Sequence, residues 1–415
     1  MKVLVVGSGA REHALVRSLM RTGEDVTCAP GNAGIAQEVA TYPVDPLDGD
    51  AVATLAAELG VHLVVIGPEA PLVAGVGDAV RAAGIACFGP GAEAARLEGS
   101  KAFAKEVMAA AGVPTAEPRV CGSMDEVAAA LDEFGAPYVV KDDGLAAGKG
   151  VVVTDDREAA VEHARACLAA GTSLVIEEYL DGPEVSLFAI SDGVTVIPLQ
   201  PAQDFKRVGD GDTGPNTGGM GAYSPLPWAP ADLVAETMRT VLQPTVDEMR
   251  RRGTPFSGLL YAGLALTSRG LRVVEFNARF GDPETQVVLA RLESPLIELL
   301  LGAATGTLAE VPPPVWSDGA AVCVVVAAEG YPEAPVSGGL ITGLADADAL
   351  DGVDVLHAGT RTEGEDIVAS GGRVLSVVGR GATLTEARGR AYAGVDLIRL
   401  PGSHHRSDIA QPASV

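Results

Sequence analysis

The residues around Glu275 have the types and spacing that phosphate chemistry needs. In a strand, Glu275 and Asn277 point to the same face because they are two residues apart. A strand can thereby offer two oxygen ligands to one Mg²⁺ ion. Arg279 follows on the same side and provides a cation that can neutralise phosphate or carboxylate. The flanking Phe276 and Phe280 favour a buried opposite face over a solvated surface strand.

A glycine-rich loop from Lys141 to Gly150 predicts a cover for a polyphosphate. It is not a P-loop, because Gly150 stands where Ser or Thr would bind magnesium. The loop lies between two runs rich in β-branched residues, 138–141 and 150–153, whose spacing predicts an antiparallel hairpin. Backbone N–H groups and a lysine at such a tip can fold over phosphates. A solvated turn is the alternative.

A longer loop, Gln203 to Pro225, has too many glycines and too few apolar residues to form a core. Such a loop is either disordered or ordered around ligands, and we favour ligands. The backbone amides of Thr217 to Gly221 predict an anion-binding nest, and Asp212 is a predicted partner for an ammonium group.

Upstream of this loop, the run from Leu174 to Glu184 is an apolar strand followed directly by acidic residues. Its main chain can read an adenine edge while a carboxylate binds ribose.

The first strand, Val3 to Val6, ends in Gly7-Ser8-Gly9, which resembles the start of a dinucleotide-binding fingerprint. Glu12 stands where the third glycine is expected, and no acidic residue ends the second strand, so NAD binding is disfavoured. A smaller phosphorylated ligand at the N-terminus of the following helix is the favoured interpretation. A purely structural turn is the alternative.

The order of these elements predicts a multidomain protein of α/β and α+β class. Residues 1–100 alternate strands with helices, as in a doubly wound parallel sheet that binds ligands at the carboxyl ends of its strands. Residues 101–310 form a second domain, with a mobile nucleotide-covering lobe at 118–186. A proline-rich linker then opens a small α+β domain over 311–402. The polar residues 403–415 are predicted to be a disordered tail.

The composition excludes several classes of partner. A formal charge of −25 repels polyanions, so neither nucleic acid nor an anionic membrane is expected as a partner. Every apolar stretch is interrupted before the roughly 20 residues that a membrane span requires. The N-terminus lacks the features of a signal peptide, so a cytoplasmic protein is expected.

Taken together, the motifs resemble the phosphoribosylamine-glycine ligase family, also called glycinamide ribonucleotide synthetases, within the ATP-grasp superfamily. The resemblance covers residues 1–400. Its most specific segments are Lys206 to Ser224 and Arg279 to Gln286, whereas Lys141 and the hairpin are typical of ATP-grasp proteins in general. The other matching segments are Gly7 to Ala14, Pro30 to Gly34, Gly67 to Leu72, Leu97 to Lys101 and Asp143 to Gly150.

The resemblance implies a central ATP-grasp domain that uses ATP with Mg²⁺ or Mn²⁺ as cofactors. It also implies that glycine and 5-phosphoribosylamine are the substrates and that the protein is a monomer or weak homodimer. For ATP, it implies phosphate contacts from Lys105, Lys141, Gly144, Gly148, Lys149 and Gly150, adenine contacts from Glu178 and Leu180, and a ribose contact from Glu184. It implies metal ligation by Glu275 and Asn277, and catalytic roles for Arg279, Lys206 and Asp212. The implied substrate-binding residues are Gly9, Gly31, Asn32, Asn216, Thr217, Gly218, Gly219, Met220, Gly221, Asp282, Pro283 and Glu284.

The implied mechanism is attack of the glycine carboxylate on the γ-phosphate of ATP, followed by displacement of the acyl phosphate by the amine. No protein nucleophile is required, so positioning, charge neutralisation and exclusion of water are the expected roles of the protein. Two departures from the family bear on ATP. The loop between Leu168 and Leu174 is short, and Asp142 adds a negative charge beside Lys141. The alternatives are another ATP-grasp carboxylate-amine ligase and a catalytically silent nucleotide-binding homologue.

Overall fold

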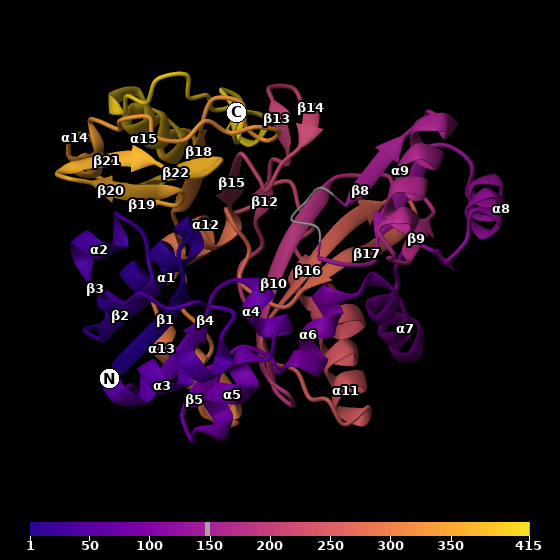
Figure 1. The fold of residues 1–415 in the computed structure, drawn as a ribbon, viewed down its shortest axis with the longest axis horizontal. Helices are drawn as coiled ribbons and strands as arrows, with labels where there is room; N and C mark the ends of the chain where they lie inside the picture. The colour runs from indigo at the N-terminus through magenta and orange to yellow at the C-terminus, as the bar shows by residue number, and fades with distance from the viewer. Residues whose placement is uncertain (146–149, 415) are drawn as a thin grey trace.

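The computed structural model of the chain describes residues 1–145 and 150–414. The chain forms an N-terminal region, a central region and a C-terminal region, which Figure 1 colours along the chain. The central region comprises a small lobe and a second antiparallel sheet. The N-terminal and C-terminal regions lie side by side at one end, and the lobe that carries α8 and α9 lies at the other. Among the described residues, no helix has both the length and the apolar character that crossing a bilayer requires.

The N-terminal region is a parallel sheet with strand order β3-β2-β1-β4-β5, which confirms the predicted doubly wound architecture. Alternate residues of β1 enter two different cores because successive side chains point to opposite faces. Leu4 packs with Val52 of α3, whereas Val5 packs with Leu15 of α1. The elements are β1 (Lys2–Gly7), α1 (Ala10–Met20), β2 (Asp25–Pro30), α2 (Ile35–Glu38), β3 (Ala40–Thr41), α3 (Gly49–Leu59), β4 (Leu63–Ile66), α4 (Glu69–Val73), α5 (Val76–Ala82) and β5 (Ala86–Phe88).

The next region is a lobe with a small core of its own. Its antiparallel sheet has the order β6-β9-β7-β8, and α8 and α9 pack against it through residues such as Leu131 and Ala164. The hairpin predicted around the glycine-rich loop is confirmed, with Val140 opposite Val152. The elements are α6 (Ala92–Gly99), α7 (Lys101–Ala111), β6 (Pro118–Cys121), α8 (Met124–Phe134), β7 (Tyr138–Asp142), β8 (Val151–Thr154), α9 (Arg157–Ala169) and β9 (Leu174–Glu177).

A second antiparallel sheet, in the order β11-β10-β16-β17, lies between this lobe and the N-terminal region. Its strand β17 ends at Asn277 and leads directly into α12, so the polar segment predicted to carry the chemistry lies at a strand end. The elements are β10 (Glu184–Asp192), β11 (Val196–Pro198), β13 (Arg207–Gly209), β14 (Thr213–Asn216), α10 (Leu233–Thr237), η1 (Met238–Leu242), α11 (Gln243–Arg251), β16 (Ser257–Thr267), β17 (Gly270–Asn277), α12 (Glu284–Arg291), α13 (Leu296–Thr305) and η2 (Leu308–Glu310).

The C-terminal region is built on a sheet in the order β12-β15-β18-β22-β19. Two of its strands, β12 (Gln203–Asp204) and β15 (Gly221–Ser224), come from the segment expected to belong to the central domain. They flank the long glycine-rich loop and so attach it to the C-terminal sheet. The other elements are β18 (Ala320–Ala327), α14 (Leu344–Asp348), β19 (Val353–His357), β20 (Thr360–Glu363), β21 (Asp366–Ala369), β22 (Arg373–Gly381), α15 (Leu384–Leu397) and η3 (Gln411–Ala413).

The stretch after residue 402 differs from the disordered tail that its polarity predicted. His404 bridges to Ala327 of β18, and Ile409 is fully buried. Arg406 is only 1% exposed, bonds Asp408 and Asp212, and lies 4.8 Å from the ring centroid of Phe205. The polar composition misled because the arginine is buried through partners such as Asp212 and Phe205, which are distant in sequence.

Candidate functional site

A buried carboxylate between two lysines lies where the small lobe meets the central sheet. Glu177, at the end of β9, is 2% exposed. Its Oε1 lies 3.1 Å from Nζ of Lys105 on α7, and its Oε2 lies 2.9 Å from Nζ of Lys141 on β7. Burial lowers the pKa of Lys105 to about 8, although Glu177 opposes the shift. Two cations around one anion leave a surplus positive charge, which is a suitable contact for a phosphate.

The hairpin next to this centre is fastened by Asp143. Its carboxylate accepts hydrogen bonds from the backbone of Ala102 (2.7 Å) and from the hydroxyls of Ser100 (3.1 Å) and Ser173 (3.0 Å). Lys101 donates to the carbonyl of Gly144 at 3.1 Å. The start of the glycine-rich loop is thus held against the N-terminus of α7.

Not all of that loop is described. The backbone carbonyl of Gly150 accepts a 2.7 Å bond from the amide of Asp142. The carboxylate of Asp142 accepts the N–H of Gly144 at 3.2 Å, so it turns to the backbone. The predicted contacts Gly148 and Lys149 lie outside the described residues.

The predicted adenine-binding residues follow β9. The amide of Glu178 donates to the carbonyl of Glu117 (3.1 Å), and its carboxylate is bound by Arg269 (2.9 Å). Within the part of the chain that the structure describes, the carbonyl of Glu178 and the amide of Leu180 have no hydrogen-bond partner. A free acceptor and a free donor suit the amino group and ring nitrogen of an adenine edge.

The cation of Lys206 is close to carboxylates of β10, β12 and β17, namely Glu184, Asp204 and Glu275. Glu184 and Lys206 form an ion pair. Burial would lower the pKa of Lys206, but the charges of Asp204, Glu184 and Glu275 outweigh it and raise the pKa. Burial raises the pKa of Asp204 to about 7, while Lys206 opposes the shift. Glu184, the predicted ribose ligand, is therefore engaged by Lys206 in this structure.

The predicted metal ligands Glu275 and Asn277 lie on adjacent same-face positions at the end of β17, opposite Gly263 and Tyr261. The carboxylate of Glu275 has no hydrogen-bond or ion-pair partner among the described residues, and Asn277 Oδ1 has one long contact, 3.4 Å from Arg279. Across residues 1–145 and 150–414, no three or more His, Cys, Asp or Glu side chains gather as a metal site. The side-chain oxygens of Glu275 and Asn277 could therefore ligate a hard cation.

Arg279 joins the central region to the N-terminal region. Its guanidinium lies 3.2 Å from Glu69 of α4 and 3.0 Å from Glu98 of α6. Burial would lower the pKa of Arg279, but these carboxylates raise it. Glu98 also accepts the amide of Ala278 at 2.7 Å. The predicted catalytic cation is thus fixed by one carboxylate of α4 in the N-terminal region and by one of α6.

Asp282 is a meeting point for loops from all three regions. Arg373 at the start of β22 lies 3.4 Å from its carboxylate, and Gln286 donates to it at 2.8 Å. A methyl group on Gly9 would lie 3.6 Å from Asp282, and one on Gly219 would lie 2.5 Å from Pro283. The neighbouring Glu284 is 3% exposed. It accepts hydrogen bonds from the hydroxyls of Tyr261 (2.6 Å) and Ser186 (3.1 Å).

Four amides of the long loop do not form the predicted anion nest, because each donates to an acceptor within the protein. Two of these acceptors follow β12, one comes from the C-terminal region and one is the Thr217 hydroxyl in the loop itself. The loop is nevertheless ordered, between β14, which ends at Asn216, and β15, which begins at Gly221. The bonds run from Thr217 to Lys206 (2.7 Å), from Gly218 to the Tyr331 hydroxyl (3.0 Å), from Gly219 to the Thr217 hydroxyl (2.9 Å) and from Met220 to Phe205 (2.7 Å).

Two further predicted site residues are Asp212, which lies apart from these clusters, and Asn32, whose side-chain amide already has hydrogen-bond partners in the protein. Asp212 is at the tip of the β13–β14 hairpin, with a 71% exposed side chain paired to Arg406. Asn32, which follows Gly31, uses its whole amide within the protein. Its nitrogen donates to carbonyls of Ser8 and His357, and its oxygen caps α2.

The N-terminus of α1 was expected to receive a phosphate, and the structure contradicts this. Glu12 is 1% exposed, and its carboxylate accepts the amide of Gly9 at 2.6 Å and the guanidinium of Arg11 at 2.5 Å. The helix therefore carries its own anion at the end where a phosphate would bind. This contact also explains why a glutamate replaces the third glycine.

Sequence reasoning assigned no role to several residues of these clusters. Glu177 ends an apolar strand, Asp204 precedes the long loop, and Glu69 follows Gly67-Pro68, so each had a weak local signal. Arg373 had none, because its partners lie more than 90 residues away: Asp282 (2.7 Å to its carbonyl) and Gly218 (2.6 Å).

Comparison with known protein families assigns most of the chain. Residues 1–98 match the model of the phosphoribosylglycinamide synthetase N domain, residues 99–285 that of the ATP-grasp (A) domain, and residues 321–412 that of the C domain.

Individual relatives agree with these matches. A phosphoribosylamine–glycine ligase of Streptomyces coelicolor is 68% identical over the full length of both chains, and one of Leifsonia xyli is 58% identical over the same extent. The crystal structure of phosphoribosylamine–glycine ligase from Thermotoga maritima superposes with a TM-score of 0.86 at 33% identity, covering 99% of this chain and 100% of that one. The biotin carboxylase domain of Hydrogenobacter thermophilus 2-oxoglutarate carboxylase shares the fold, with a TM-score of 0.73 at 19% identity over 97% of this chain and 91% of that one.

Proposed function

Because this chain belongs to the phosphoribosylglycinamide synthetase family, we propose that it joins glycine to 5-phosphoribosylamine at the expense of ATP, in purine biosynthesis. The observation that carries the proposal is that all three domain models match in order, while the contacts at Arg279 and Asp282 join residues from all three regions. A cytoplasmic monomer or weak homodimer is proposed with it.

ATP is proposed to lie between the small lobe and the central sheet. The free carbonyl of Glu178 and amide of Leu180 would bind adenine, and Lys105 and Lys141 would bind the phosphates. Glu184 would exchange part of its ion pair with Lys206 for the ribose hydroxyls. Magnesium or manganese fits Glu275 and Asn277, since both ions prefer oxygen ligands. The carboxylate of Glu275 has no hydrogen-bond or ion-pair partner among the described residues, and Asn277 has one long contact. The metal would supply charge neutralisation on the phosphates.

The proposed reaction has two steps. A glycine carboxylate oxygen attacks the γ-phosphorus and ADP leaves, which forms glycyl phosphate. The amine nitrogen of 5-phosphoribosylamine then attacks the carbonyl carbon, phosphate leaves and the nitrogen loses a proton. Lys206 and Arg279 would orient and neutralise the carboxylate and phosphoryl oxygens. Closely packed protein around Asp282 and Glu284 would keep water from the acyl phosphate.

The amine substrate is proposed to bind where the loops meet at Asp282. Gly9 and Gly219 lack side chains, which lets their backbones come close to this point, since a Cβ would meet Glu12 at the first and Pro283 at the second. Arg373 provides a cation beside them for the sugar phosphate. Asp212 would take part only if the β13–β14 hairpin moved, because its carboxylate is bound by Arg406.

The test is ADP release by the purified protein with ATP and magnesium. Release that requires both glycine and 5-phosphoribosylamine, and that Glu275→Ala abolishes, supports the proposal. Glu365→Ala, an exposed carboxylate in the β20–β21 turn, is the matched control and should keep full activity. Release that requires a different carboxylate or amine would assign another ATP-grasp ligase. The absence of any substrate-dependent release would assign a silent homologue.

A further inference from the structure

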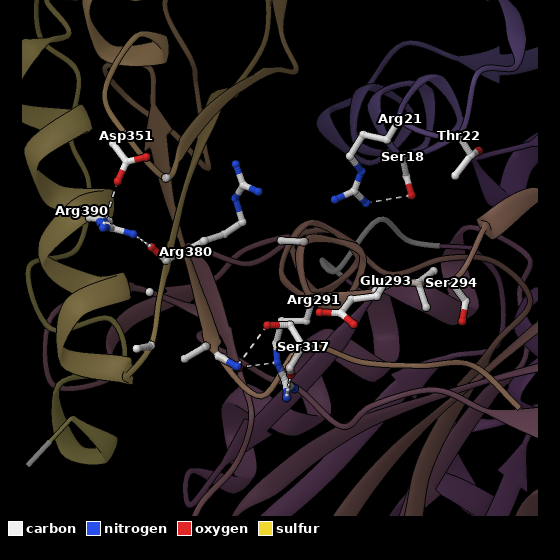
Figure 2. Close-up of a pocket in the computed structure, with 17 residues that line it drawn as sticks. Ser18, Arg21, Thr22, Arg291, Glu293, Ser294, Ser317, Asp351, Arg380 and Arg390 are labelled. Atoms are coloured by element: carbon white, nitrogen blue, oxygen red, sulfur yellow. Dashed lines mark hydrogen bonds and ion pairs between the residues drawn. The ribbon is translucent and has the colours of Figure 1, made fainter.

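A second cavity lies outside the clusters described above, at the junction of α1, the end of α12 and the C-terminal region. Its volume is about 730 Å³. Figure 2 shows side chains from these three regions around it. Pockets for small ligands have volumes of about 300–1,000 Å³, so this one has room for a ligand of nucleotide size.

Four arginines line this cavity, Arg21, Arg291, Arg380 and Arg390, against two carboxylates, Asp351 and Glu293. Asp354 and Glu386 pair with Arg380 and Arg390, so the arginines are not in excess over the nearby carboxylates. Burial lowers the pKa of Arg21, and Arg380 nevertheless lies close enough for its charge to lower this pKa further. An anion between Arg21 and Arg380 would relieve this repulsion.

Two of the four guanidiniums have N–H donors for which the described residues provide no acceptor. Arg21 donates from one nitrogen, Nη2, to Ser18 and Leu289, and no described residue accepts from its Nε or Nη1. Arg380 has one ion pair, from Nε to Asp354 at 3.3 Å, and within the described ranges its two Nη groups have no hydrogen bond. In Figure 2 the two side chains extend toward one another across the cavity.

The other two arginines define the walls. Arg291 is 6% exposed, and its three nitrogens donate to neutral oxygens of Gly319, Ser224 and Ser317. Its charge therefore has no carboxylate within ion-pair distance among the described residues, and burial lowers its pKa. Arg390 is neutralised by Asp351 (3.1 Å) and Glu386 (3.0 Å).

We propose that this cavity binds a phosphate-bearing anion between Arg21 and Arg380. Phosphate suits the site because arginine donors match its oxygens in pairs, and because one phosphate can accept hydrogen bonds from both guanidiniums at once. Ser18, Ser294 and Ser317 also line the cavity, and their hydroxyls provide further donors. The space beyond the two arginines accommodates the organic part of a phosphate ester.

The cavity is connected to the ligase site by three elements. Helix α1 begins beside Gly9 and ends at Met20, next to Arg21, and its eleven residues span about 16 Å. Helix α12 begins at Glu284 and ends at Arg291. Strand β22 begins at Arg373, which bonds the Asp282 carbonyl, and ends beside Arg380. An anion in the cavity therefore contacts the far ends of elements whose near ends build the ligase site.

Equilibrium dialysis with radiolabelled inorganic pyrophosphate tests the proposal without using ligase activity. The full chain is first saturated with magnesium and a non-hydrolysable ATP analogue, and ionic strength is held constant with chloride. We expect one binding event per chain that Arg380→Met weakens by about tenfold or more, since it removes charged hydrogen-bond donors. Arg361→Met removes a charge from the exposed β20 and is the matched control, which should bind like the unmodified protein.

Arg21→Met is the second variant and should show the same loss. Thermal unfolding shows whether Arg21→Met folds. If it does not, the test rests on Arg380→Met, which should fold because the Arg380 side chain is 42% exposed and its ion pair among the described residues is with Asp354. Equal pyrophosphate binding by the unmodified protein, Arg380→Met and Arg361→Met would overturn the proposal. Competition by a nucleoside 5′-monophosphate then identifies the source of the phosphate. If the nucleoside monophosphate binds more tightly than pyrophosphate, the ligand of the cavity is a nucleotide. If it binds more weakly, the ligand is a free inorganic anion.

Discussion

The affinity for ATP should depend on the protonation of Lys105. Burial holds the pKa of this lysine at about 8 in the folded protein, against an ordinary value of 10.5. Between pH 7 and pH 9 its charged fraction then falls about tenfold. One charged hydrogen bond to a phosphate contributes about 1.5–3 kcal/mol, equivalent to at least tenfold in affinity, so the loss of charge is large enough to measure. We therefore expect the Kd for MgATP to rise about tenfold over this range.

Isothermal titration calorimetry of MgATP binding at half-unit steps of pH measures this dependence. Lys105→Met should bind ATP weakly at every pH, with no inflection near pH 8, because the titrating group is gone. Lys2→Met is the matched control, since Lys2 is exposed on β1 and its ammonium group donates to the Leu59 carbonyl at 3.2 Å. A flat profile for the unmodified protein, or an inflection that persists in Lys105→Met, would refute the reasoning.

Three further predictions concern contacts that join segments distant in sequence. Asp143→Ala removes three hydrogen bonds at the base of the hairpin, so the Kd for ATP should rise severalfold in the same titration; an unchanged Kd would mean that the hairpin needs no such anchor. Arg373→Ala should raise the KM for the amine substrate about tenfold, since it removes a charge-assisted contact, while ATP affinity stays constant; Arg361→Ala is its control, and a loss of ATP affinity would contradict the assignment. Phe280→Ala should lower the free energy of unfolding by about 4 kcal/mol in urea titrations, because this 1% exposed ring packs against Phe88 and Phe188; a loss below about 1 kcal/mol would show that the contact between regions is not part of the core.

The predicted elements that were correct rest on local physics. The parallel sheet of residues 1–88 follows from short β-branched runs separated by helices. The β7–β8 hairpin follows from two apolar runs around one glycine-rich loop. The strand that carries Glu275 and Asn277 follows from alternation with Phe276, which is 3% exposed.

The predictions that failed concern the hydrogen-bond and ion-pair partners of polar groups. The acceptors of the amides at Thr217 to Met220 could not be known, because they depend on how the loop folds back to Phe205 and on where Tyr331 of the C-terminal region lies. Glu12 looks like a departure from a fingerprint, yet it caps its own helix. Arg406 looks like part of a polar tail, yet it is buried against Asp212. In each case a polar residue has the same local signature whether its partner is a ligand, water or a distant side chain.

The sequence by itself determined the family, the succession of regions and the residue types at the nucleotide and metal positions, because these depend on periodicity and on motifs of contiguous residues. Only the tertiary structure decided that Glu177 lies between Lys105 and Lys141, that Arg279 is held by Glu69 and Glu98, and that four arginines surround a second cavity. The physical reason is that charge interactions act over a few ångströms in space, whereas the groups concerned are separated by up to 369 positions along the chain, from Arg21 to Arg390.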